Sequence, residues 1–290
     1  MIIKNLAYSV GEKKINLKEK FGDVVIKKTG IPIAYETSLS SLDLLKKAIK
    51  KCNKNDFQNV SAIIHVTQSD TYSMPNDASF IQELCNIDND SLCFNINQGC
   101  SGFVQALGLA NSLIKTYGYE KIIITTSDTY RSFLRENDRS TNSIFSDASS
   151  VNIIENKKGY KLKKFINFTD GNGAKFLIKK NKGNDELLMN GVEIFNFAKN
   201  IVINKILKKI NEDKILNSIF YIHQASNLVL KEIYKIIPMS NCRSNLIKFG
   251  NTVSTSIPLL INNYPLKDKN IFLIGFGVGL SASLIELNYE

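Results

Sequence analysis

The chain has 290 residues, of which 43% are hydrophobic and 22% are charged, so it is long enough to bury a large core. Lysine and arginine exceed aspartate and glutamate by 37 − 27 = 10, which favours acidic partners unless the basic face is merely solvated. No apolar run reaches the ~18 residues of a membrane helix, no nucleic-acid-binding motif is present, and the first residues lack a secretory pattern. We therefore expect a cytoplasmic protein that binds neither membrane nor nucleic acid.

Short β-rich apolar runs alternate with amphipathic stretches along the chain. In chain order, the pattern predicts a helix at 40–52, strands at 60–67 and 91–97, a helix at 102–118, strands at 121–127 and 150–155, a helix at 191–210, a strand at 218–223, a helix at 227–237 and a strand at 270–277. Continuous apolar strands between helices predict a layered α/β fold with helices on both faces of the sheet. The polar stretch 155–186 is expected to form hairpins or exposed loops between two halves of similar order.

Cys100 lies where a strand end and a tight turn give way to helical spacing, in "NINQGCSGFVQALGLA". Gly99 and Gly102 allow the backbone to turn sharply and to approach a ligand closely. Free N–H groups at a helix start stabilise a thiolate, so this position predicts a catalytic cysteine with a lowered pKa. The alternative is a small buried cysteine at a turn. The other cysteines are expected to be free thiols, and their spacing predicts neither a disulfide framework nor a metal site: Cys52, Cys85, Cys93 and Cys242.

The chain has only two histidines. His65 alternates within a predicted strand and is interpreted as a satisfied sheet residue. His223 follows the strand "SIFYI", at the kind of strand end where α/β folds display catalytic groups. Asn251 lies in a Gly-Asn-Thr turn, and the glycine-rich turn in "IGFGVGLSASL" offers backbone N–H groups for an oxyanion. Papain-like proteases use Cys, His and Asn in this order, but the flank "NQGCSGF" and the absence of tryptophan do not fit them.

Six stretches in this order resemble the β-ketoacyl-acyl-carrier-protein synthase III family of the thiolase superfamily, as a divergent member. They are "NINQGCSGFVQALGLA", "TTSDTYRSFLRENDRSTNSIFSDASSV", "MNGVEIFNFA", "YIHQAS", "KFGNTVSTSIPLLI" and "IGFGVGLSASL". The resemblance implies a thiolase-like fold of two similar α/β halves in αβαβα layers. Residues 1–157 would form the half with the nucleophile, and residues 158–290 the half with the histidine and asparagine.

By this resemblance, Cys100 accepts an acyl group as a thioester. His223 and Asn251 would then stabilise the enolate that forms when a malonyl-type extender loses carbon dioxide. The backbone N–H groups of Cys100 and Val278 would form the second oxyanion hole. The substrates would be acyl-CoA or acyl-carrier-protein thioesters, with no other cofactor. The resemblance also implies a homodimer joined at the strand "SLCFNIN", with Met74 in "DTYSMPNDAS" reaching into the acyl pocket of the partner.

Several positions depart from the family pattern. Val24 and Lys28 stand where the family has a Trp and an Arg that grip the CoA nucleotide, so a carrier-bound donor is expected. Ser226 replaces an asparagine near the pantetheine path, which makes Ser226 and Lys28 candidate substrate-binding residues. Two alternatives remain open: an acyltransferase that passes the acyl group to a hydroxyl or amine, and a non-catalytic partner that binds acyl carrier protein.

Overall fold

The computed structural model describes residues 1–180 and 186–290. Its first sheet has five strands in the order β1-β7-β6-β4-β5. Strand β4 runs parallel to β5 and β6, whereas β7 runs antiparallel to β6 and to β1. Strand β4 is buried throughout, as its continuous apolar sequence predicts. The bounds are β1 (Ile2–Val10), β4 (Ala62–Val66), β5 (Leu92–Ile96), β6 (Lys121–Asp128) and β7 (Ala148–Glu155).

The second sheet repeats the topology of the first, in the order β8-β14-β13-β11-β12. Strand β11 runs parallel to β12 and β13, whereas β14 runs antiparallel to β13 and to β8. The strands of the first sheet end at Glu155 and those of the second begin at Tyr160, so the polar turn between them separates two halves of one design. The bounds are β8 (Tyr160–Thr169), β11 (Ile219–Ile222), β12 (Cys242–Arg243), β13 (Asn270–Gly277) and β14 (Ser281–Tyr289).

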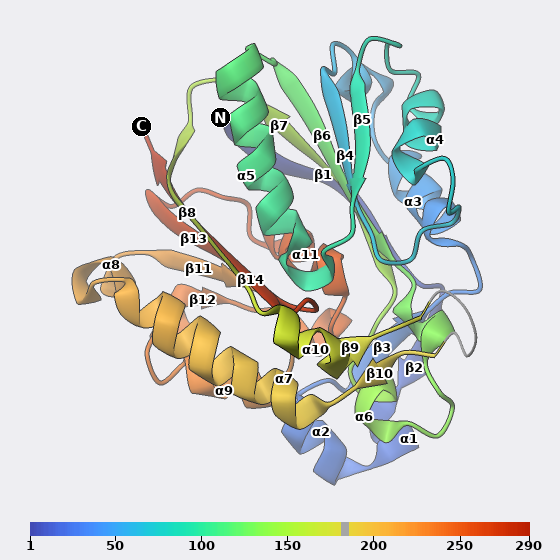
Figure 1. The fold of residues 1–290 in the computed structure, drawn as a ribbon, viewed down its shortest axis with the longest axis vertical. Coiled ribbons are helices and arrows are strands. Elements are labelled where there is room, and N and C mark those ends of the chain that lie inside the picture. Colours follow the sequence, from blue (N-terminus) through green and yellow to red (C-terminus); the bar gives the residue numbers. More distant parts are fainter. Residues whose placement is uncertain (181–185) are drawn as a thin grey trace.

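The two sheets and their helices form the five layers of a thiolase-like αβαβα arrangement (Figure 1). Helices α5 and α11 fill the layer between the sheets, and one apolar cluster joins them to strands of both. Helices α3 and α4 cover the outer face of the first sheet, whereas α9 and the extension of α7 cover that of the second. The bounds are α3 (Ser41–Ile49), α4 (Asp77–Leu84), α5 (Gly99–Tyr117), α7 (Gly191–Phe197, extended by a π-helix at Ala198–Ile206), α9 (Asn227–Ile233) and α11 (Ser256–Asn263).

Smaller elements gather at the end of the molecule where α5 begins, at the bottom of Figure 1. They are β2 (Lys13–Asn16), α1 (Leu17–Phe21), α2 (Asp23–Thr29), β3 (Ile33–Glu36), α6 (Arg139–Asn142), β9 (Leu177–Ile178), β10 (Leu188–Met189) and α10 (Leu246–Phe249). Helix α8 (Glu212–Leu216) lies at the far end of the second outer layer, beyond the extension of α7. Short 3-10 turns join many of these elements, at Lys54–Phe57, Tyr130–Phe133, Gly171–Phe176, Leu207–Lys209, Met239–Asn241 and Val253–Thr255.

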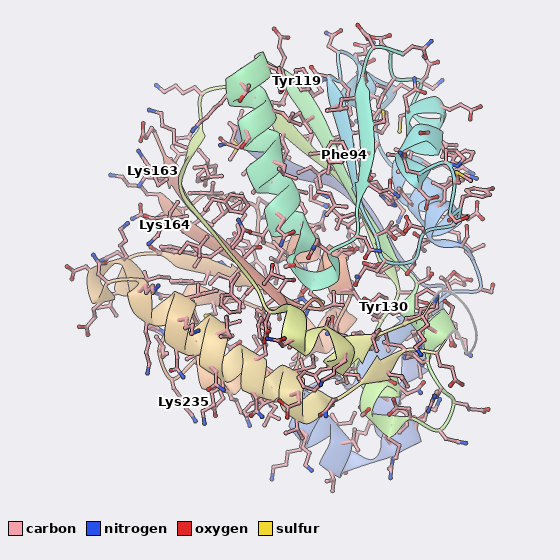
Figure 2. The ribbon with its side chains drawn as sticks, viewed as in Figure 1. Phe94, Tyr119, Tyr130, Lys163, Lys164 and Lys235 are labelled. Atoms are coloured by element: carbon pink, nitrogen blue, oxygen red, sulfur yellow. The ribbon has the colours of Figure 1, made fainter. Side chains whose placement is uncertain are left out.

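The polar stretch 155–186 differs in part from its prediction. It contains the ten-residue strand β8, which pairs with β14 at the far end of the chain rather than with a local hairpin partner. Strand β8 lies at a sheet edge and exposes lysines, including Lys163 and Lys164, which project outward in Figure 2. This exposure hides the apolar signal that marks the inner strands. In the described part of the chain, no helix is long and apolar enough to cross a membrane.

Candidate active site

Cys100 lies in the first turn of α5 and is 5% exposed. The turn requires glycine at residue 99, because φ there is +46° and a Cβ would lie 2.3 Å from Oε1 of Gln68. On the opposite side, two glycines of strand β13 leave room for Cys100 because they carry no side chain. A Cβ at Gly277 would lie 3.0 Å from Sγ of Cys100, and one at Gly275 would lie 2.7 Å from the Cys100 carbonyl oxygen. The sequence analysis predicted no packing role for Gly275 or Gly277. Their alternation in "IGFG" indicates that both face the same side of the strand, which is the side that Cys100 contacts.

The expectation that the helix start lowers the pKa of Cys100 is wrong for this structure. Burial raises the pKa of the Cys100 thiol, and the nearby Asp128 carboxyl raises it further. The effect of burial on the thiol pKa is therefore larger than the lowering that the helix N-terminus would provide. Cys100 is a neutral thiol at neutral pH and must lose its proton as it reacts.

Asp128 ends strand β6 beneath the cysteine. Its carboxylate accepts hydrogen bonds from the backbone N–H of Gln68 at 2.8 Å and from the backbone N–H and hydroxyl of Ser254. Burial nevertheless raises the pKa of Asp128 to about 7, against the lowering effect of these donors. The residue joins the loop after β4 to the turn after Asn251 and places a titratable group near Cys100, a role that the sequence did not indicate.

His223 follows β11 and is 1% exposed. Its backbone N–H donates to the carbonyl of Ile274 at 2.9 Å, and its ring meets Phe276 edge-on with centroids 5.5 Å apart. Nδ1 is buried and has no hydrogen-bond partner among the described residues, so the ring edge that lines the cavity carries Nε2. Burial lowers the pKa of His223 to about 3, and the imidazole is therefore neutral.

Asn251 is held by its own backbone on both sides. Its N–H donates to the carbonyl of Ile144 at 3.1 Å, and its carbonyl accepts from the N–H of Ser146 at 2.9 Å. The side-chain oxygen accepts from the N–H of Val253 at 3.0 Å. Within residues 1–180 and 186–290, the amide nitrogen makes a single long contact of 3.4 Å, to the carbonyl of Ala225, and remains able to donate to a ligand.

Cys100, His223 and Asn251 line one cavity of about 680 Å³. Lys28 and Ser226 line it as well, so the structure brings both candidate substrate-binding residues to the predicted site. Arg139 is a further cation at this cavity that the sequence analysis left without a role. Most of the remaining wall is apolar, formed by residues such as Leu177, Met189, Ile194, Phe195, Val229 and Phe276.

Two predicted residues lie outside this wall. The side chain of Val278 borders the turn before the cysteine, since its Cγ1 would be 2.7 Å from a Cβ on Gly99. This neighbourhood is compatible with an oxyanion role for the Val278 N–H, which stays a prediction. Met74 is 85% exposed in the loop before α4 and does not line the cavity of its own chain. Its contribution to a partner subunit also stays a prediction.

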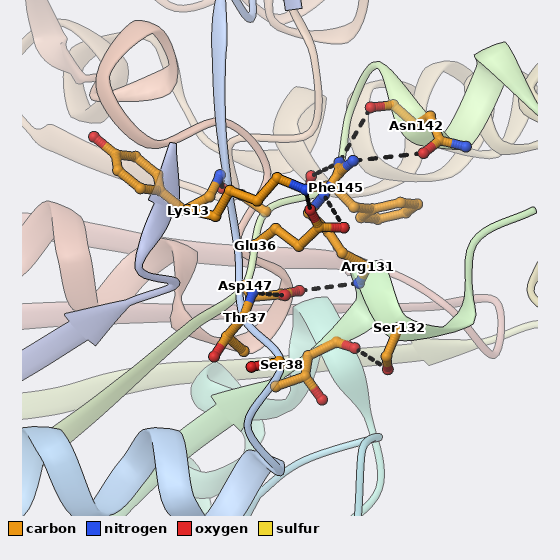
Figure 3. Close-up of polar contacts among 12 residues, drawn as sticks. Lys13, Glu36, Thr37, Ser38, Arg131, Ser132, Asn142, Phe145 and Asp147 are labelled. Carbon is orange, nitrogen blue, oxygen red and sulfur yellow. Dashed lines mark hydrogen bonds and ion pairs between the residues drawn. The ribbon is translucent and has the colours of Figure 1, made fainter. Parts of the chain in front are cut away.

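Arg131 binds the segment 139–145, which lines the cavity, and Figure 3 shows its polar contacts. Its buried guanidinium donates to the carbonyls of Asn142 at 3.2 Å and Phe145 at 3.0 Å, and its Nε lies 3.7 Å from a Glu36 oxygen. Its backbone N–H donates to Asp147 at 2.9 Å. These contacts order the segment 139–145, from which several side chains face the cavity. A buried arginine at residue 131 was not predicted from the sequence.

His65 lies in the sheet as predicted, but among the described residues only one of its two ring nitrogens has a hydrogen-bond partner. It is fully buried in β4, and its Nδ1 lies 2.8 Å from the Thr125 hydroxyl on the neighbouring strand. Within residues 1–180 and 186–290, no group of three or more His, Cys, Asp or Glu side chains is arranged to hold a metal ion.

The duplicated five-stranded sheets around a central helix define a thiolase-like fold, with a cysteine at the start of that helix. A solved 3-oxoacyl-(acyl-carrier protein) synthase from Burkholderia xenovorans is 28% identical, with a TM-score of 0.86 over 99% of this chain and 94% of that one. A solved 3-oxoacyl-(acyl-carrier-protein) synthase III is 26% identical, with a TM-score of 0.87 over the whole of both chains. The Thermus thermophilus synthase III has a TM-score of 0.88 at 22% identity, over 99% of each chain, and shows the fold alone.

Sequence comparison narrows this class to one family. The family model for 3-oxoacyl-[acyl-carrier-protein] synthase III matches residues 94–171. The β-ketoacyl-[acyl-carrier-protein] synthase III of Clostridium acetobutylicum is 30% identical over 91% of this chain and 87% of its own. That of Acholeplasma laidlawii is 29% identical over 90% and 83%. The chain therefore belongs to the β-ketoacyl-acyl-carrier-protein synthase III family of acyl-transferring condensing enzymes, as its motifs predict.

Proposed function

We propose that this protein loads an acyl group onto Cys100 and condenses it with a malonyl-type thioester on acyl carrier protein. The observation that carries the proposal is the single cavity lined by Cys100, His223 and Asn251, which come from three distant parts of the chain. Simple acyl transfer needs a nucleophile and a base, whereas condensation also needs two donors for an enolate. The cavity offers the cysteine nucleophile together with two such donors, on His223 and Asn251.

In the first step, Sγ of Cys100 attacks the carbonyl carbon of the donor thioester. The bond to the donor sulfur breaks, and the donor leaves as a thiol that carries away the proton of Cys100. Because the pKa of Cys100 is raised, this proton leaves as the sulfur attacks and passes to the departing donor sulfur, while His223 stays neutral with its proton on Nε2. The N–H groups of Cys100 and Val278 would stabilise the tetrahedral oxyanion.

In the second step, a malonyl-type thioester loses carbon dioxide and becomes an enolate. Nε2 of His223 and Nδ2 of Asn251 would each donate a hydrogen bond to the enolate oxygen. The enolate carbon then attacks the acyl carbonyl on Cys100. The carbon–sulfur bond breaks, the cysteine takes up a proton, and a β-ketoacyl thioester leaves. A neutral histidine suits this step, since it can donate from one nitrogen without carrying a charge.

The cavity mouth favours a carrier-bound donor. Val24 on α2 is 72% exposed, where a tryptophan of the family would stack on a nucleotide base. Lys28 and Arg139 line the cavity and provide cations for the phosphate of a pantetheine arm. At the nucleotide end, Val24 offers no ring to stack on the base and Lys28 is a point charge where the family has an arginine, so we infer weaker binding of CoA than of an acidic carrier protein.

We also propose a homodimer through the edge strand β5. This strand is an edge of the first sheet, carries no charged residue in Leu92–Ile96, and exposes 42% of Leu92. Phe94 lies on it in Figure 2. The edge strand β8 of the second sheet instead carries Lys161, Lys163 and Lys164, which discourage pairing. An uncharged edge thus remains available to a second copy of the chain.

Intact-protein mass spectrometry tests the proposal directly. Incubation with acyl-carrier-protein and acyl-CoA donors should add one acyl group, which Cys100→Ser abolishes and the matched control Cys242→Ser retains. Later addition of malonyl carrier protein should release carbon dioxide and a β-ketoacyl product. His223→Ala and Asn251→Ala should each slow condensation by on the order of 10²–10³.

Two other results would overturn parts of this account. Loading followed by transfer to a hydroxyl or amine, without release of carbon dioxide, would identify an acyltransferase. A folded protein that binds acyl carrier protein but is never acylated would identify a non-catalytic partner.

A further inference from the structure

The backbone of Asn251 pairs with a short segment that lies far earlier in the chain. Phe145 and Asn251 form an isolated parallel β-bridge. The N–H of Asn251 donates to the carbonyl of Ile144 at 3.1 Å, and its carbonyl accepts from the N–H of Ser146 at 2.9 Å. The place of the Asn251 side chain in the cavity therefore depends on where the segment 144–146 lies.

Arg131 holds the same segment. Nη1 of its guanidinium donates to the carbonyl of Phe145 at 3.0 Å and to that of Asn142 at 3.2 Å. The Ile144 carbonyl thus binds Asn251, and the next carbonyl, that of Phe145, binds Arg131. The segment is hydrogen-bonded to the buried arginine and to the asparagine of the site at adjacent peptide groups.

Arg131 is itself fixed by charged partners, which Figure 3 shows. Its side chain is 2% exposed, its Nε lies 3.7 Å from a Glu36 oxygen, and Glu36 also accepts from Nζ of Lys13 at 2.7 Å. The backbone N–H of Arg131 donates to Asp147 at 2.9 Å, and the same carboxylate accepts from the N–H of Thr37 at 3.0 Å. A planar guanidinium held in this way can fix two carbonyls at once, whereas an ammonium on a flexible stem does so less well.

The other two groups of the site are fixed by different elements. His223 follows β11, and its N–H donates to the carbonyl of Ile274 on β13 at 2.9 Å. Cys100 lies in the first turn of α5. A displacement of the segment 144–146 therefore acts on Asn251 more directly than on the histidine or the cysteine.

We propose that Arg131 is a positioning residue for the condensation step, because it fixes the Asn251 amide through the segment 144–146. The proposal rests on the proposed function, in which Nδ2 of Asn251 donates to the enolate oxygen. Such a donor must lie about 2.7–3.1 Å from the developing charge, and a misplacement of about 1 Å costs about 100-fold in rate. Loss of the Arg131 contacts should slow condensation and spare the acylation of Cys100, which uses the other oxyanion hole.

Single-turnover mass spectrometry separates the two steps. The protein is first acylated at Cys100 with a donor that loads the wild type, and loss of the acyl group is then followed at saturating malonyl carrier protein. Arg131→Met, which removes every guanidinium donor, should slow this loss by about 10- to 100-fold. Arg131→Lys keeps a charge beside Glu36, which protects the test against misfolding, and should slow the loss to a smaller extent. Both variants should acylate at the wild-type rate.

Two control variants separate this effect from the loss of any arginine and from lower stability. The guanidinium of Arg135 binds the exposed Glu186, so Arg135→Gln should keep both rates. Ile63→Val removes a methyl group from the buried strand β4 and should lower the resistance to urea without slowing either step.

Combining Arg131→Lys with Asn251→Ala distinguishes positioning from a general effect on the structure. If Arg131 acts through the Asn251 amide, the double variant should condense as slowly as Asn251→Ala alone. The inference would be overturned by the same slowing in both backgrounds, by equal slowing of acylation and condensation, or by a wild-type condensation rate in the folded Arg131→Lys protein. Failure of the wild type to load or to condense would instead refute the proposed function.

Discussion

Replacing Gly277 by alanine probes the fit of the nucleophile against strand β13. The added Cβ would lie 3.0 Å from both Cβ and Sγ of Cys100, closer than side-chain carbons normally approach. Helix α5 is packed between the two sheets, so the cysteine cannot retreat freely. Overpacking of this kind costs about 1–3 kcal/mol, of which about 0.4–1 kcal/mol is offset by the loss of glycine entropy in the unfolded chain. We expect the free energy of unfolding of Gly277→Ala to fall by roughly 1–2 kcal/mol.

The same displacement should slow acylation. A shift of about 1 Å in a reacting group costs about 100-fold, so a few tenths of an ångström should cost several-fold to tenfold. Urea unfolding and mass-spectrometric acylation measure the two effects. Gly171→Ala is the control, because nothing lies within 4 Å of its added Cβ. Gly275→Ala should be worse than Gly277→Ala, since its Cβ would meet the backbone of Cys100 and Ser101. Wild-type stability and acylation in Gly277→Ala would show that the sulfur does not lie where the structure places it.

Three further predictions follow from the charges and edges of the molecule. Asp128→Asn removes a nearby negative charge that raises the pKa of Cys100, so the pH profile of iodoacetamide alkylation should move to lower pH. An unchanged profile would mean that burial alone determines the pKa of the Cys100 thiol. The net charge of +10 should make kcat/KM for acyl carrier protein exceed that for the matching acyl-CoA at low salt, with a smaller preference at high salt. Equal or better kinetics with acyl-CoA at every salt concentration would contradict the carrier preference. Phe94→Lys places a charge on the edge strand β5 and should shift sedimentation from dimer to monomer at micromolar concentration, whereas Lys163→Ala on β8 should have no such effect. A wild-type monomer would rule out the proposed dimer.

The buried strands and the central helix could be predicted from the sequence. Strands β4, β6 and β13 each begin with an apolar run and are buried along nearly their whole length, because helices cover both faces of each sheet. Helix α5 was predicted from its apolar periodicity, and its start from the glycines around the cysteine. The edge strand β8 was missed because its exposed lysines give no apolar signal. A strand at the border of a sheet is defined by its partner, and the partner of β8 lies more than a hundred residues away.

The sequence by itself determined the fold class, the family and three candidate catalytic residues, because short motifs at strand ends carry that information. Tertiary structure decided the environment of those residues. The neutral thiol of Cys100 and the neutral imidazole of His223 follow from burial, which depends on the packing of both halves. The contacts of Asp128 with Ser254 and of Arg131 with Glu36 likewise join residues that are far apart in the sequence (Figure 3 shows the second). Local spacing does not encode such contacts, since they exist only once distant segments of the chain have packed together.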